Sequence, residues 1–176
     1  RAKEELVRRA DEFAALYETS RDLTLQLDLS MLLQTITEKA IALLGADNSL
    51  IYLYDAAADN IELAVTNGVN MPLGTRLAMG EGVCGAVAKT RAPLRVDNYR
   101  EWDQQSPKYQ GLPIAATLAV PMFYGGELIG VLGVSKSEKT ERKFSQEDER
   151  LLTLFAFQAA SAVHGARLFD DTRVRA

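Results

Sequence analysis

The fold is decided by the stretch Thr117-Leu-Ala-Val-Pro-Met-Phe-Tyr-Gly-Gly-Glu-Leu-Ile-Gly-Val-Leu-Gly-Val134. Two apolar runs rich in β-branched and aromatic residues flank Gly125-Gly126, and such a pair of glycines suits the tight turn of a β-hairpin, which requires positive φ. The second run, residues 128–134, has no charged side chain, as expected for a strand that is covered on both faces. We therefore expect a central hairpin with other elements packed on both sides of it.

The residues before this hairpin predict a second hairpin and a long connection. Residues 49–54 and 60–67 alternate between apolar and polar side chains, which indicates two paired strands. A short helix is expected over residues 80–90, followed by a brief strand at residues 94–96. Residues 97–113 then form a long connection, and such connections within small domains are usually functional or mobile.

Helical patterns lie at both ends of the chain. Residues 1–27 contain no Gly or Pro and repeat apolar side chains at helical spacing. Asp28 or Ser30 is expected to cap a second helix that ends at Gly45. The spacing in Ser145-Gln-Glu-Asp148 predicts a capping box at the start of the last helix. This order of elements predicts an α+β fold with an antiparallel sheet.

Composition excludes several classes of protein. Of the 176 residues, 47% are hydrophobic and 25% are charged, a balance typical of a globular protein with a buried core. A net charge of -4 argues against nucleic-acid binding, and no apolar stretch is long enough for membrane insertion. One cysteine forms no internal disulfide, so we expect a cytoplasmic protein. Because the chain lacks a first Met and is helical at both ends, we expect a segment of a longer polypeptide.

Four motifs, taken in order along the chain, resemble the GAF domains, which are small-molecule sensing and dimerisation modules of signalling proteins. They are Gly80-Glu-Gly-Val-Cys-Gly-Ala-Val87, Pro93-Leu-Arg-Val-Asp97, Ala119-Val-Pro-Met122 with Gly126-Glu-Leu-Ile-Gly-Val131, and Phe144-Ser-Gln-Glu-Asp-Glu149. The resemblance covers about residues 28–169. It implies a PAS-related, six-stranded antiparallel sheet with the terminal helices on one face and loops plus short helices over the other.

The same resemblance implies a domain organisation in which three segments have different roles. Residues 1–27 would be a signalling and dimerisation helix, residues 28–169 the GAF domain, and residues 170–176 the start of a linker helix. The domain would bind a small molecule and relay its state to an effector in the same polypeptide, as in a histidine kinase. It would have no catalytic activity of its own. An alternative is a ligand-free GAF module that only dimerises.

The polar and aromatic residues of the loop-rich half are candidates for a ligand pocket, with two valines as its apolar wall. Tyr99, Trp102 and Tyr109 favour stacking on a planar molecule, or else a collapsed lid. Val83 and Val87, one helical turn apart, suit either a pocket wall or plain core packing. The full candidate set is Arg76, Val83, Cys84, Val87, Asp97, Tyr99, Trp102, Tyr109 and Thr117.

Two narrower alternatives follow from family resemblance. Some GAF relatives hold a bilin through a cysteine and others reduce methionine sulfoxide, but Cys84 has no second cysteine, and His164 lies far along the sequence. A small buried hydrophobe is the simpler interpretation of Cys84. Lys136 and Asp148 resemble a motif of cyclic-nucleotide-binding GAF domains, although Ser135 replaces its Asn. We expect these two residues to form a structural ion pair. The sequence identifies no cofactor and no metal site.

A homodimer through the terminal helices is also expected from the resemblance. The helical patterns place apolar side chains at regular spacing on both helices. The residues expected to form that interface are Leu6, Phe13, Leu151, Phe155, Ala162 and Phe169.

Overall fold

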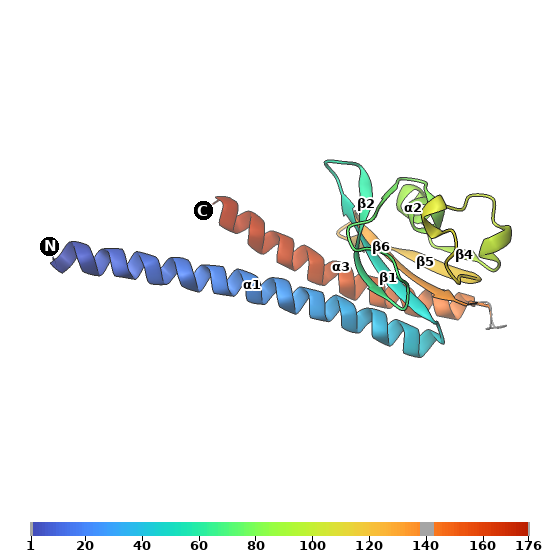
Figure 1. The fold of residues 1–176 in the computed structure, drawn as a ribbon, viewed down its shortest axis with the longest axis horizontal. Coiled ribbons are helices and arrows are strands. Elements are labelled where there is room, and N and C mark those ends of the chain that lie inside the picture. Colours follow the sequence, from blue (N-terminus) through green and yellow to red (C-terminus); the bar gives the residue numbers. More distant parts are fainter. Residues whose placement is uncertain (1, 138–142, 176) are drawn as a thin grey trace.

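A computed structural model of the chain describes residues 2–137 and 143–175, apart from the side chains of residues 18–26 and 169–175. Six strands form one antiparallel sheet in the order β3-β2-β1-β6-β5-β4 (Figure 1). The strands are β1 Asn48–Asp55, β2 Asn60–Asn67, β3 Arg76–Ala78, β4 Leu94–Val96, β5 Ala116–Tyr124 and β6 Glu127–Lys136.

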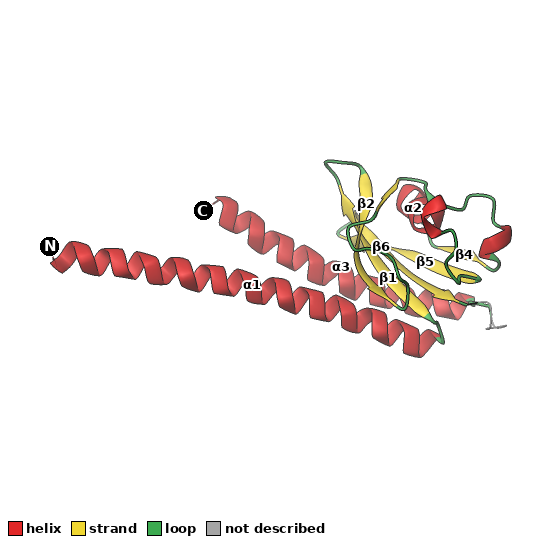
Figure 2. Cartoon of the chain, in the orientation of Figure 1, coloured by secondary structure: helices red, strands yellow, loops and turns green. Residues whose placement is uncertain are grey.

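Helices cover both faces of this sheet. The long helices α1 (Ala2–Leu44) and α3 (Gln146–Arg175) lie side by side on one face, while α2 (Gly82–Thr90) lies on the other (Figure 2). The connection that follows β4 contains two 3-10 turns, η1 (Tyr99–Glu101) and η2 (Pro107–Tyr109). The predicted α+β architecture, with six antiparallel strands between terminal helices and a loop-rich face, is therefore confirmed.

The central hairpin forms where the Gly125-Gly126 pair predicts it. β5 and β6 are adjacent, and both turn glycines have positive φ, 57° and 81°. A third glycine, Gly130, lets β6 lie close to β1, because a Cβ at this position would clash with the carbonyl oxygen of Tyr52. Only glycine fits this approach.

Two apolar cores lie on opposite faces of the sheet. Ile51 and Leu118 belong to the core beneath α1 and α3, and Tyr52 and Ala119 to the core beneath α2. Consecutive residues divide between the cores because side chains of a strand alternate between its two faces. The same strands therefore contact the terminal helices on one side and the loop-rich half on the other.

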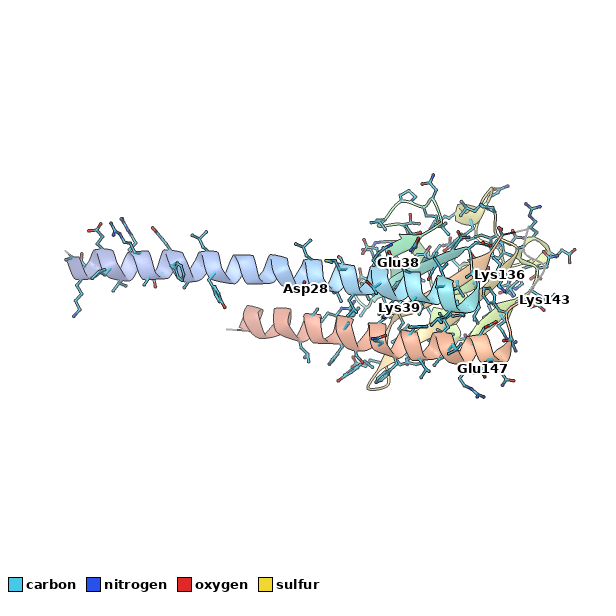
Figure 3. All side chains as sticks on the ribbon, turned by 90° about the horizontal axis from the view of Figure 1, so that it is seen from below. Asp28, Glu38, Lys39, Lys136, Lys143 and Glu147 are labelled. Atoms are coloured by element: carbon cyan, nitrogen blue, oxygen red, sulfur yellow. The ribbon has the colours of Figure 1, made fainter. Side chains whose placement is uncertain are left out.

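The N-terminal helix differs from its expected form. The predicted start of a second helix at Asp28 or Ser30 is wrong, because α1 is helical from Ala2 to Leu44. Figure 3 shows Asp28 in the middle of this unbroken helix. Residues 2–44 contain no Gly or Pro, so no residue forces a stop, and the polar side chains of Asp28 and Ser30 are exposed.

The other helix boundaries agree better with the sequence. Ser145 and Asp148 form the predicted capping box: Ser145 N–H donates to Asp148 Oδ2 at 2.8 Å, and Asp148 N–H donates to Ser145 Oγ at 3.2 Å. The strand β3 was not expected, since only Leu77 of its three residues is buried. Among the described helices, none combines the length and the apolar composition that crossing a membrane requires.

Candidate functional site

A small cavity lies between the sheet and the loop-rich half. Its volume is about 30 Å³, room for about two water molecules. Strands β1, β5 and β6 form its floor, and α2 with the connection that carries η1 and η2 forms its roof. Five of the nine candidate residues line it: Val83, Cys84, Tyr99, Tyr109 and Thr117.

The other four candidates lie away from the cavity. Arg76 is exposed on β3, where its guanidinium contacts Asp55 at 2.9 Å and Glu62 at 3.2 Å. Asp97 is exposed and lies 3.9 Å from Lys143. The remaining two pack in the core beneath α2: Val87 is fully buried, and half-buried Trp102 packs against Tyr99 with ring centroids 5.9 Å apart.

Three polar residues of the cavity were missed by sequence reasoning. Asn48 and Ser135 face each other across β1 and β6, and Ser135 pairs with Thr117 across β6 and β5. The strand register thus places Asn48, Ser135 and Thr117 in one row on the floor, while Ser49 also lines the cavity. Polar residues within strands that are buried on both faces are the signal that could have found them.

Most polar groups of this row are satisfied. The Asn48 side chain donates to the carbonyls of Asp47 and Gly68 and accepts from Ser135 Oγ at 3.0 Å. Ser49 Oγ donates to the carbonyl of Gly133 at 2.9 Å. These bonds fix the floor, since a buried polar group without a partner is costly.

Two hydroxyls of the cavity are exceptions. Tyr99 Oη and Thr117 Oγ1 are buried and make no hydrogen bond of ordinary geometry within the described part of the chain. Tyr99 is only 6% exposed, and burial raises the pKa of its phenol, although the backbone N–H of Ser106 acts in the opposite direction. Both residues line the same cavity. A cavity wall therefore presents two unused hydrogen-bonding groups.

The hydroxyl of the other roof tyrosine, Tyr109, is held by a hydrogen bond. Tyr109 Oη lies 2.5 Å from Tyr52 Oη, and both tyrosines are buried. Burial is the largest cause that raises the pKa of each phenol, so both stay protonated at neutral pH. Tyr109 also packs edge-on against Tyr99, with ring centroids 6.3 Å apart. The hydrogen bond between Tyr109 and Tyr52 links the roof to β1.

A carboxylate outside the cavity anchors the same roof. Glu81 Oε2 accepts from Ser106 Oγ at 2.6 Å, and Glu81 Oε1 accepts from the backbone N–H of Ala78 at 3.1 Å. Lys108 Nζ lies 3.4 Å from Glu81 and donates to the carbonyl of Arg76. Desolvation opposes ionisation of Glu81, but these hydrogen bonds outweigh it and lower its pKa. The turn η2 is thereby tied to β3 and the start of α2.

The thiol of Cys84 lies inside the cavity. It is buried, and a Cβ placed on Gly133 would lie 3.5 Å from its Sγ. Desolvation raises the pKa of Cys84 to about 12, so the thiol carries no nucleophilic charge at neutral pH. His164 lies on α3 instead, stacked on Tyr124 with ring centroids 4.0 Å apart. In the described ranges, no three His, Cys, Asp or Glu residues gather as a metal site.

A wider cleft lies next to the cavity. Its volume is about 670 Å³, and it includes polar side chains of the connection such as Arg100, Gln105 and Gln110. Tyr99, Tyr109 and Ile114 line both the cleft and the cavity. These three side chains are the partition between the outer cleft and the inner cavity.

Lys136 is buried beside the last helix. It is 2% exposed, and its Nζ lies 4.7 Å from the centroid of the Phe144 ring, a cation–π geometry. Asp148 takes part in the capping box with Ser145. An ion pair between Lys136 and Asp148 stays a prediction.

The residues expected at a dimer interface fall into two groups. Leu6 and Phe13 of α1 are 67% and 72% exposed. Leu151 and Phe155 are half-buried against the core beneath α1 and α3, and Ala162 is also half-buried. The side chain of Phe169 lies outside the described residues. Among the described side chains of α3, three large apolar ones are instead exposed: Leu154, Phe157 and Leu168.

Comparison with known proteins gives a consistent family assignment. The family model named GAF domain matches residues 28–163. A Nif-specific regulatory protein of Azospirillum brasilense is 27% identical over 171 residues, which cover 92% of this chain and 27% of that protein. A probable 3',5'-cyclic phosphodiesterase, pde-5 of Caenorhabditis elegans, is 27% identical over 139 residues, 76% of this chain and 19% of that protein.

A solved structure supports the same fold. The GAF domain of a phosphoenolpyruvate-protein phosphotransferase from Coxiella burnetii superimposes with a TM-score of 0.73 at 24% identity. The match covers 81% of this chain and 86% of that one. By contrast, the chain spans only about a fifth to a quarter of the length of the two curated relatives.

Proposed function

We propose, because this chain belongs to the GAF domain family, that it is the sensory unit of a signal-transduction protein such as a histidine kinase. A small molecule binds between the sheet and the roof, and its presence is relayed through α1 and α3 to an effector domain in the same polypeptide. The domain acts in the cytoplasm as a regulatory unit without catalysis of its own.

The observation that carries this proposal is that the central strands contact the cavity with one face and the core beneath α1 and α3 with the other. In β5, Thr117 faces the cavity and its neighbour Leu118 packs in the core beneath α1 and α3. A ligand that displaces β5 therefore changes the packing of α3 directly, and α1 in turn packs against α3. Close-packed protein interiors transmit such strain.

The test measures movement of the helices. Candidate metabolites are first screened for a rise in melting temperature, because a ligand that binds the folded state stabilises it. For each hit, spin labels at Arg9→Cys and Leu168→Cys report the distance between the helices with and without the molecule. A shifted distance supports relay, and an unchanged distance with clear binding contradicts it. A label pair at Lys39→Cys and Thr153→Cys, nearer the sheet, serves as a control for label motion.

A second candidate function is a dimerisation module that has no ligand, and the size of the cavity favours it. Pockets for small molecules are usually about 300–1,000 Å³, far larger than the cavity seen here. Ligand binding requires the partition of Tyr99, Tyr109 and Ile114 to move outward. Native mass spectrometry of the purified protein separates the two functions, since a co-purifying small molecule contradicts the ligand-free one.

We also propose a homodimer through the terminal helices. Large apolar side chains are exposed on α1 at Leu6, Phe13 and Met31 and on α3 at Leu154 and Phe157. Leu6, Phe13 and Met31 occupy a and d positions of one heptad pattern, which favours pairing with another helix. A molar mass of about 19 kDa by light scattering at micromolar concentration contradicts this proposal, and about twice that mass supports it.

Two other GAF functions fit this cavity poorly. No Lys or Arg lines it among the described residues, so nothing there neutralises the phosphate of a cyclic nucleotide. The protonated thiol of Cys84 is also unsuited to attack on a bilin or a sulfoxide. A Cys84→Ser protein is expected to keep the absorption and redox behaviour of the parent.

A further inference from the structure

The inner cavity has a distinctive chemical character that the family assignment does not specify. Its walls are mostly apolar, with Leu50, Val69, Val83 and Ile114 among them. No Asp, Glu, Lys, Arg or His lines it within residues 2–137 and 143–175. A charge placed there would lose its hydration without gaining an opposite charge, which is costly.

The hydroxyls of Tyr99 and Thr117 give this apolar cavity a place for directional hydrogen bonding. Tyr99 Oη comes from the roof and Thr117 Oγ1 from the floor, and both are buried without a hydrogen bond of ordinary geometry, although the backbone N–H of Ser106 faces Tyr99 Oη. Other polar side chains on the floor already have partners, because Asn48 and Ser135 bond to each other and Ser49 bonds to Gly133. Buried hydroxyls are rarely left unpaired in folded proteins. The two groups thus mark where a polar atom of a ligand would be accepted.

We propose that the ligand of this cavity is an uncharged, largely apolar molecule whose polar group hydrogen-bonds to Tyr99 Oη and Thr117 Oγ1. This inference rests on the proposed sensory function and adds the chemical class of the ligand. A hydroxyl can both donate and accept, so an alcohol, amide or ketone group satisfies the pair. The free volume of about 30 Å³ holds about two non-hydrogen atoms, so a larger part enters only as the partition moves outward.

The access route follows from the shared walls. Tyr99 and Ile114 separate the outer cleft from the cavity, while Tyr109 is held by Tyr52. Of the two tyrosines in the partition, Tyr99 has no comparable bond to the sheet. Tyr99 therefore moves most easily, and its hydroxyl is also the group that gains a partner when a ligand binds.

The test uses three probes of equal size and different charge: 2-propanol, acetate and isopropylammonium. Each has four non-hydrogen atoms. Chemical shifts of the methyl groups of Val69, Val83 and Ile114 report binding in the cavity during titration of the full chain. We expect saturable shifts with 2-propanol and none with either ion, because only the neutral probe avoids the cost of burying a charge.

Matched variants then test the two hydroxyls. Thr117→Val and Tyr99→Phe keep the shape of the side chain and remove only the oxygen. Each is expected to weaken 2-propanol binding about fivefold to tenfold, the effect of losing one hydrogen bond. Thr153→Val, which removes an exposed hydroxyl on the outside of α3, is the control and leaves binding unchanged.

The melting temperature of the probe-free variants gives an independent readout. If the hydroxyls have no partner in the free protein, Thr117→Val and Tyr99→Phe do not lower it. A clear fall for both variants, with no methyl shift from 2-propanol, overturns the proposal and identifies the pair as the site of a structural water. Binding of acetate or isopropylammonium at the same methyl groups also overturns the ligand class, while leaving a sensory function in place. Absence of sensing itself is judged separately, by the spin-label distances.

Discussion

Tyr52 on β1 and Tyr109 on η2 join the sheet to the roof through a hydrogen bond between their hydroxyl oxygens, 2.5 Å apart and buried. Tyr52→Phe removes one partner and leaves the other hydroxyl with less hydrogen bonding in the core. We expect a loss of about 1–2 kcal/mol in the free energy of unfolding. Urea denaturation measures it.

A double-mutant cycle isolates this bond. Tyr109→Phe is expected to cost a similar amount, but the double variant should cost clearly less than the sum, because neither hydroxyl is then left behind. Strict additivity would contradict a direct interaction between the two side chains.

The anchor of the roof at Glu81 predicts a pH dependence. The folded-state pKa of Glu81 lies below its ordinary value of 4.5, so the carboxylate stabilises the fold at pH values above 4.5. This contribution is lost as the pH falls through the folded-state pKa. Glu81→Gln is therefore expected to lower stability at pH 7 and to reduce the further loss on acidification from pH 5 to pH 3. Thermal melts across this range measure both effects.

Ser106→Ala provides the companion measurement. It removes the hydrogen bond of 2.6 Å to Glu81 without changing the charge of the protein. The loss of stability on acidification should be smaller than in the parent protein, as in Glu81→Gln. If neither variant changes the pH dependence of stability, the Glu81 anchor is not its source.

Substitution of two phenylalanines of α3 is expected to affect different properties, folding stability in one case and self-association in the other. Phe155 packs against the core beneath α1 and α3, whereas Phe157 is 63% exposed. Phe155→Ala is expected to lower the free energy of unfolding by about 2–3 kcal/mol, because it leaves a partly buried void. Phe157→Ala should leave unfolding nearly unchanged but weaken self-association. Denaturation at low protein concentration and sedimentation equilibrium measure the two quantities, and equal effects of both variants on folding would contradict this division of the helix.

Two glycines form a second matched pair. Gly130→Ala places a Cβ against the carbonyl of Tyr52 and is expected to destabilise the fold by about 3 kcal/mol or more. Gly165 lies in α3 with nothing within 4 Å of an added Cβ, so Gly165→Ala should stabilise by about 0.5–1 kcal/mol. Melting temperatures that move in opposite directions would support both assignments, while a tolerated Gly130→Ala would contradict the close contact between β1 and β6.

The sequence predicts those elements that short-range chemistry determines. The Gly125-Gly126 turn and the capping box of Ser145 and Asp148 depend on neighbouring residues, and both form as expected. Asp28 and Ser30 have suitable side chains for a cap, yet nothing near them ends the preceding helix. The helix therefore continues through both residues, and α1 is a single helix from Ala2 to Leu44.

The candidate site is harder to predict because it depends on the pairing of distant strands. Thr117 lies beside Ser135 and Asn48 only through the register of β5, β6 and β1. Conversely, Arg76 and Asp97 have the polar chemistry of a binding site but lie on the exposed β3 and beyond β4. The aromatic residues of the roof can be predicted from the composition of the loop-rich half. The polar row of the floor can be recognised only once the strand register is known.

The uninterrupted course of α1 makes it a rigid arm. Residues 2–28 extend about 40 Å at 1.5 Å per residue, and in Figure 1 the N-terminal end of α1 projects beyond the end of α3. A tilt of about 5° where α1 rests on the sheet would displace the far end by about 3.5 Å, from this length and simple geometry. A hinge at Asp28 would absorb that tilt, but a continuous helix magnifies it. Small rearrangements at the sheet thus become displacements of the size of a side chain at the opposite end.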